Sequence, residues 1–225
     1  MKKIGMLIFI SALSVGLVFS TNCGYGSFSN LSGIQGSGTA KSETRAVTGF
    51  TKVNAGGAVN VEIVAQKDFS VVVEADDNLL ANIKTEVSGD TLKIYSEDRI
   101  SPKTRINVKI SMPAIEGLDL SGASSGSVSS VKADSLELKA SGASKIRIDG
   151  AAKELNADAS GASAIDAESL QTQDADVEAS GASRATVAAT GELKVEASGA
   201  SKIVYVGEPK NLQQNSSGAS SVTKK

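Results

Sequence analysis

The chain has 225 residues and a formal net charge of −2, with 23 Lys and Arg against 25 Asp and Glu. It contains no His, no Trp and a single Cys, which excludes His-dependent catalytic triads, His-ligated zinc sites and internal disulfides. Clustered basic charge, which nucleic-acid binding requires, is also missing, so we expect no nucleic-acid partner.

The N-terminus has the pattern of an export signal. Lys2–Lys3 precede an apolar run over Ile4–Phe19, which is too short for a spanning helix of about 20 residues and predicts a signal peptide over residues 1–22. The only cysteine, Cys23, follows at once. Its context resembles a bacterial lipobox, although Ser20–Asn22 replace the usual Leu, small residue and Gly or Ala. We therefore expect lipidation at Cys23 and a membrane partner through the acyl chains.

The same residues leave an alternative open, namely ordinary secretion with cleavage after Ser20 and a free Cys23 thiol. If Cys23 is lipidated, Gly24 follows it in place of the Asp that retains Gram-negative lipoproteins at the inner membrane. The expected location is therefore the outer membrane or cell surface, and the alternative is a periplasmic or secreted protein.

Residues 23–48 are rich in Gly, Ser and Thr and show no sustained period. They predict a flexible tether, which as a random coil would span roughly 25–30 Å. The remainder, residues 49–225, is expected to form one β-solenoid domain. Within it, residues 49–117 form a degenerate N-terminal half and residues 118–225 form regular rungs.

In the degenerate half, strand patterns occur at residues 59–64, 69–74, 91–95 and 106–110, with a hairpin-type turn at 88–90. A helical turn within residues 76–83 is expected to be capped by Asp76 or Asp77. We expect this half to cover the open N-terminal end of the stack. Its aromatic residues are expected to form the core of that cover: Phe50, Phe69 and Tyr95.

In the regular half, the tetrapeptide Ser-Gly-Ala-Ser recurs six times at intervals of 18–20 residues. Apolar residues fall at every second position on both sides of it, which is the signature of strands and excludes helical repeats. The predicted fold is an all-β parallel β-helix of about six rungs, with small residues at a tight corner. We expect the alanine methyl of each corner to enter the core. The corners begin with these pairs: Ser121 and Gly122, Ser141 and Gly142, Ser160 and Gly161, Ser180 and Gly181, Ser198 and Gly199, and Ser217 and Gly218.

An acidic column precedes the corners on consecutive rungs, formed by Asp158, Glu178 and Glu196. One hypothesis is a ladder that binds a hard cation. The preferred interpretation is a solvated face with diagonal ion pairs to a basic column after the corners, formed by Lys145, Arg184 and Lys202. No metal and no cofactor are therefore expected. An ice-binding surface is not favoured, because outward threonine ladders are missing.

Four segments and the repeat together resemble a known family. The segments are F-x-x-V-x-A-x-G-A-V-x-V from Phe50, V-x-A-D-D-N-L-L from Val73, G-D-T-L-K-I from Gly89 and V-K-I-S-M-P from Val108. With the repeated S-G-A-S, this order is similar to the head GIN domain of putative auto-transporter adhesins over about residues 48–222. The resemblance implies a right-handed β-helix without catalytic residues and a role in adhesion.

We expect a surface-anchored lipoprotein with an adhesin-like interaction or structural role and an unknown protein or glycan partner. The alternative is a β-helix that binds or modifies a polysaccharide. That function would need aromatic platforms, and in the regular half only Tyr205 is available, at a position predicted to point inward. An enzyme is not expected, and the sequence does not indicate an oligomeric state.

Overall fold

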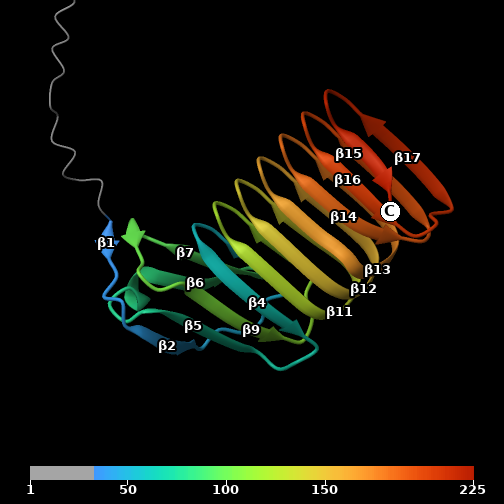
Figure 1. The fold of residues 1–225 in the computed structure, drawn as a ribbon. Coiled ribbons are helices and arrows are strands. Elements are labelled where there is room, and N and C mark those ends of the chain that lie inside the picture. The colour runs from blue at the N-terminus through green and yellow to red at the C-terminus, as the bar shows by residue number, and fades with distance from the viewer. Residues whose placement is uncertain (1–32) are drawn as a thin grey trace, which may run out of the picture. The chain divides into compact units, whose positions relative to one another are not determined.

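The computed structural model describes residues 33–225, which form one compact unit (Figure 1). The predicted signal peptide, Cys23 and the first part of the predicted tether lie outside the described residues.

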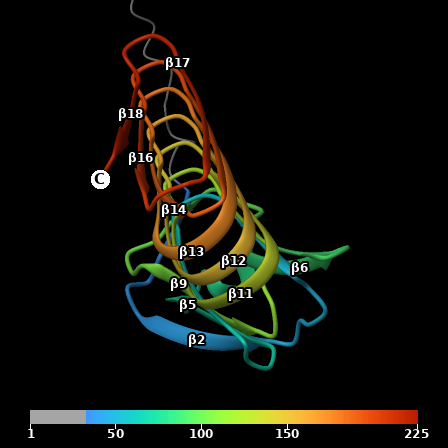
Figure 2. The ribbon, with the colours of Figure 1, turned by 90° about the vertical axis from the view of Figure 1, so that its right-hand side faces the viewer.

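The regular half is a stack of parallel rungs. Three long strands each leave one corner, bend, and run on into the next corner: β11 (Ser125–Ala140), β12 (Lys145–Ala159) and β13 (Ala164–Ala179). We call the side formed by strands that lead into a corner the entry side, and the side formed by strands that leave it the exit side. Neighbouring rungs pair in parallel, which confirms the β-helix (Figure 2).

Later rungs follow the same path with separate strands. On the exit side these are β14 (Arg184–Ala189), β16 (Lys202–Val206) and β18 (Ser221–Lys224). On the entry side they are β15 (Glu192–Ala197) and β17 (Asn211–Ser216). Within β12 the register with both neighbouring strands shifts near Asp149–Gly150.

The N-terminal half continues the parallel stack. On the entry side, β10 (Gly117–Leu120) pairs with β3 (Lys52–Ala55), which pairs with β7 (Thr91–Ser96). On the exit side, β11 pairs with β4 (Val59–Ala65), which pairs with β9 (Ile106–Met112). These strands are the predicted degenerate rungs.

Antiparallel strands extend both sides beyond these rungs. On the exit side, β9 pairs with β5 (Ser70–Asp76), and β5 pairs with β2 (Ala40–Arg45). On the entry side, β7 pairs with β6 (Ile83–Ser88) across the predicted turn. A separate parallel pair joins β1 (Ile34–Gln35) to β8 (Ile100–Ser101). The N-terminal half is therefore a parallel stack with an antiparallel cover.

The prediction of a flexible tether over residues 23–48 is wrong for the part that contains β1 and β2. The segment between these two strands is held by Asp76–Asn78: the Ser37 N–H donates to the Asn78 side chain at 2.8 Å, and the Asn78 amide donates to the Gln35 carbonyl at 2.8 Å. Gly36 has to be glycine, because a Cβ there would collide with the Asp76 carboxylate. These partners lie about 40 positions away in the sequence, so a local pattern does not reveal them.

The prediction that Asp76 or Asp77 caps a helical turn is also wrong. The only helical element between residues 33 and 225 is the 3-10 helix η1 (Leu80–Asn82), whose N-cap is Leu79 without a side-chain bond. Asp76 is instead fully buried. Its carboxylate accepts backbone N–H groups from Gly38 at 2.7 Å, Lys103 at 2.8 Å and Thr104 at 3.1 Å. Burial acts to raise the pKa of Asp76, but these hydrogen bonds hold the pKa below its ordinary value.

The core runs along the whole stack as columns of inward aliphatic side chains, such as Leu118, Leu138, Ala157, Val177 and Val195, each at most 2% exposed. In the N-terminal half, the buried Phe50 ring packs on Phe69 with centroids 5.0 Å apart.

No helical segment in the part of the chain that the structure describes has the length and hydropathy needed to cross a membrane.

Candidate functional site

The Ser-Gly-Ala-Ser corners form a ridge along the stack, held together by repeated hydrogen bonds. From the second corner to the fifth, the fourth residue is buried, and its hydroxyl donates to a carbonyl of the preceding rung: for example, Ser163 Oγ to Ala140 O at 2.9 Å, and Ser183 Oγ to Ala159 O at 2.8 Å. The expectation that the alanine methyl enters the core is wrong, because the alanines are exposed. The turn directs the serine inward in place of the alanine.

The glycine of each corner is required by two features at once. Gly161 has a φ of +72°, and a Cβ there would lie 2.8 Å from the Gly142 carbonyl oxygen. That oxygen accepts the Ala162 N–H at 2.7 Å, so the rungs are already in close contact. The ridge is therefore a structural element.

The entry side carries a broad acidic surface over three rungs. Because the strands are in register, outward side chains form columns along the stack. Seven acidic side chains project from the entry-side segments of β12, β13 and β15, and Lys194 is the one basic side chain among the outward residues of these segments. We name the seven the acidic flank: Glu154, Asp158, Asp174, Asp176, Glu178, Glu192 and Glu196.

The three predicted ladder residues do stack, since Asp158 is in register with Glu178 and Glu178 with Glu196. Among residues 33–225, however, no group of three or more acidic, His or Cys side chains could hold a metal ion. Glu196 is instead bonded to Lys194 at 3.2 Å, and Lys194 lies equally close to Asp176. Hydrogen bonds to Asp176 and Glu196 raise the pKa of Lys194, which stays a cation.

The exit side carries the predicted basic column, with Lys145, Arg184 and Lys202 all exposed. The expected diagonal ion pairs to the acidic column are wrong: within the described part of the chain, none of the ion pairs joins the two columns. The corner turns the chain between them, so the two columns lie on different sides of the ridge. The molecule therefore presents an acidic side and a more basic side.

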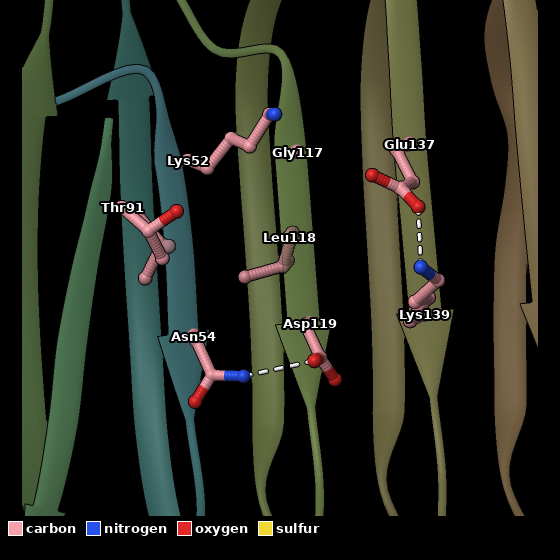
Figure 3. Close-up of a pocket in the computed structure, with 9 residues that line it drawn as sticks. Lys52, Asn54, Thr91, Gly117, Leu118, Asp119, Glu137 and Lys139 are labelled. Carbon is pink, nitrogen blue, oxygen red and sulfur yellow. Dashed lines mark hydrogen bonds and ion pairs between the residues drawn. The ribbon is translucent and has the colours of Figure 1, made fainter. Parts of the chain in front are cut away.

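A shallow hollow of about 230 Å³ lies on the entry side where the regular rungs meet the N-terminal half (Figure 3). It forms because Gly117 interrupts a column of outward side chains between Lys52 and Glu137. Its polar groups are already paired with one another: Asn54 donates to Asp119 at 2.8 Å, and Lys139 bonds to Glu137. The hollow therefore offers a ligand few polar groups that lack a partner.

A more apolar hollow of about 540 Å³ lies near the N-terminal end and is lined by Val59, Ile83, Ile100 and Ile106 together with Tyr95. The prediction that Tyr95 belongs to the core is therefore wrong. Its ring is half-buried at this hollow, and its hydroxyl donates to Glu86 at 3.1 Å.

The sequence pattern predicted one acidic column but not the width of the acidic flank. Glu154, Asp174, Glu192 and Asp176 lie in two further columns beside it. The sequence did contain a signal for these columns, because the four residues alternate with the residues predicted to point inward.

The fold is a parallel β-helix with a corner repeat and an antiparallel N-terminal cover. The family model described as "putative auto-transporter adhesin, head GIN domain" matches residues 49–209, and the chain belongs to this family.

Solved structures share the fold. A putative adhesin from Bacteroides fragilis is 18% identical, with a TM-score of 0.71 over 86% of this chain and 100% of the other. A putative adhesin from Parabacteroides merdae is 16% identical, with a TM-score of 0.53 over 85% and 98%. A putative lipid binding protein from Parabacteroides distasonis is 19% identical, with a TM-score of 0.50 over 85% and 99%. No curated protein matches the chain.

Proposed function

We propose that this protein is a bacterial lipoprotein, anchored through Cys23 at the outer membrane or cell surface, which binds a partner through the flank of its β-helix. The observation that carries the proposal is the acidic flank, where seven carboxylates and one lysine project from three rungs. The family membership and the adhesin-like fold support the same role.

The flank is suited to a broad interaction rather than to catalysis. The aligned strands hold its side chains at a spacing of about 4.8 Å along the stack. Such a surface favours an extended partner with basic groups, because complementary charge steers association and selects the partner.

The alternative of a polysaccharide-binding or polysaccharide-modifying β-helix has less support. Tyr205, the aromatic residue of the regular half, is half-buried and packs against the core. The described flanks therefore lack the aromatic platform that sugar binding would use.

Two experiments test the proposal separately. Labelling cells with palmitate should mark the protein and fail for Cys23→Ala, and protease added to intact cells should digest it. Persistent labelling of the variant, or protection from protease, would refute anchoring or display respectively.

The flank is tested by charge reversal. The double variant Glu178→Lys and Glu196→Lys should reduce adhesion of protein-coated beads to host matrix by about tenfold. The matched control Lys145→Glu and Lys202→Glu, on the other side of the ridge, should leave that adhesion unchanged. Equal loss in both pairs would show that the acidic flank is not the binding surface.

A further inference from the structure

Among the described residues, the strands of the C-terminal rung form a sheet edge. Within the described chain, β17 pairs only with β15 and β18 only with β16. Backbone groups in a parallel strand alternate between its two neighbours. The Asn211 N–H donates back to Gly191 O, whereas the Ala197 carbonyl points forward and accepts the Ser217 N–H at 2.9 Å. By the same alternation, the backbone groups of Leu212, Gln214 and Ser216 point forward from the last rung.

This edge lacks the protection that the other end of the molecule has. Edge strands normally avoid pairing with other chains through charged residues, proline or short length. At the N-terminal end, β2 contains Lys41, Glu43 and Arg45 and β6 contains Lys84 and Glu86. The six residues of β17 are N-L-Q-Q-N-S, with no charge and no proline.

The outward positions of β15 are charged, but those of β17 are not. In β15, the outward positions are Glu192, Lys194 and Glu196, and their partners in register in β17 are Asn211, Gln213 and Asn215. The inward position of Leu193, which is fully buried, is taken by Leu212, which is 38% exposed. The edge therefore combines unpaired backbone, neutral amides and one exposed apolar side chain.

We propose that β17 of one copy pairs in antiparallel fashion with β17 of a second copy, joining two stacks tail to tail. An antiparallel pair places forward-pointing residues opposite one another. A two-fold axis at Gln214 therefore sets Gln214 opposite its own copy, Leu212 opposite Ser216, and Gln213 opposite Asn215.

The composition of β17 suits an identical partner. Like charges directly opposite one another destabilise a sheet, and a charged edge would face its own charges in a symmetric pair. Side-chain amides carry both donors and acceptors, so identical amides can bond to one another. The preceding charged residue, Lys210, would face Gly218 of the second copy rather than another lysine.

The pairing has a consequence for adhesion, and this consequence rests on the proposed anchoring through Cys23. The described chain begins at β1, at the end of the stack opposite β17 (Figure 1). A tail-to-tail pair directs its two N-termini apart, so copies anchored on two cells would join those cells.

Disulfide trapping tests the register of the pair. The chain from Cys23 onward would carry Cys23→Ser together with one new cysteine. Gln214→Cys should form a disulfide-linked dimer on mild oxidation, because opposed residues of this kind have Cα atoms about 5.5 Å apart. Gln213→Cys on the same strand and Ser42→Cys on β2 should stay monomeric. Equal crosslinking of all three, or none with Gln214→Cys, overturns the proposed pairing.

Sedimentation velocity tests the association without crosslinking. The unsubstituted chain should show a monomer–dimer equilibrium, and Gln214→Lys should shift it to monomer by placing two lysines opposite each other. Ser42→Lys adds the same charge at the other end and should leave the dimer intact. Gln214 is exposed, so at concentrations where the parent is monomeric the variants should melt at the same temperature as the parent. A parent that is monomeric up to its solubility limit overturns the proposal.

A bead-clumping experiment tests cell joining separately from the pairing of β17. Beads coupled through the Cys23 thiol should clump, because β17 then points outward, and Gln214→Lys should abolish clumping. Beads coupled through a C-terminal biotin should stay dispersed. Dimers in solution without clumping would refute cell joining alone, whereas failure of palmitate labelling would refute the anchor and leave the pairing intact.

Discussion

The two ends of this β-helix differ in how the described chain covers them. At the N-terminal end, antiparallel strands and the buried Asp76 carboxylate cover the last parallel rung with contacts that occur once in the molecule. From residue 118 onward, each rung repeats the same corner hydrogen bonds, and the last one has no described neighbour. Stability in a stack of this kind accrues from neighbouring rungs. Single substitutions should therefore have their largest effects where a contact is unique.

Asp76→Ala should have the largest effect. It removes the acceptor for three backbone N–H groups, from Gly38, Lys103 and Thr104. Donors left buried without a partner are strongly destabilising. Thermal melting and limited proteolysis should show residues 33–45 released before the stack unfolds. Asp77→Ala is the comparison: it removes only exposed bonds from Ser37 and Asn78 and should have a smaller effect, and an equal effect there would argue against a special role for Asp76.

Leu193→Ala and Leu212→Ala compare the same inward column one rung apart. Leu193 is fully buried and Leu212 is 38% exposed. The first should lower the free energy of unfolding by about 2–5 kcal/mol, because it leaves a cavity. The second should lower it by less than about 1 kcal/mol, in proportion to the smaller area buried. Urea titration measures both, and equal losses would show that the last rung is covered in solution.

Acid should loosen the N-terminal end before the rungs. Because the pKa of Asp76 lies below its ordinary value of 3.8 in the folded protein, its contribution to stability is fully present above that pH. The contribution is lost as the pH falls through the lower pKa of the folded state. Hydrogen exchange should show earlier exposure of β1 and β2 than of β12 in strong acid, and simultaneous exposure would contradict this order.

Ser163→Ala should have a small effect, about 1 kcal/mol. It removes the hydroxyl bond to Ala140 O, but that carbonyl still accepts the Ser160 N–H at 2.9 Å. Ser160→Ala, at the half-exposed first position of the same corner, should change the melting temperature less. A larger loss at Ser160 would reverse the assignment of the inward serine.

The regular half could be predicted in detail because each rung repeats the same local pattern. Alternation around each corner identified the strands. The Gly57 carbonyl accepts the Ala123 N–H as later corner glycines accept from the next corner, so the degenerate half uses the same corner contact. The cover was harder to predict. The segment Gly36–Gly38 has no period of its own, and its partners Asp76 and Asn78 are distant in sequence.

The sequence by itself determined the class of fold, the repeat, the inward columns and the family, because period-two alternation and the tetrapeptide are local signals. Only the tertiary structure decided which side chain of the corner turns inward, and it showed that the acidic and basic columns lie on separate sides of the ridge. It also showed that β1 and β2 are strands and that Asp76 is a buried anchor for backbone groups. Each of these depends on backbone directions and distant partners, which are set only when the rungs stack.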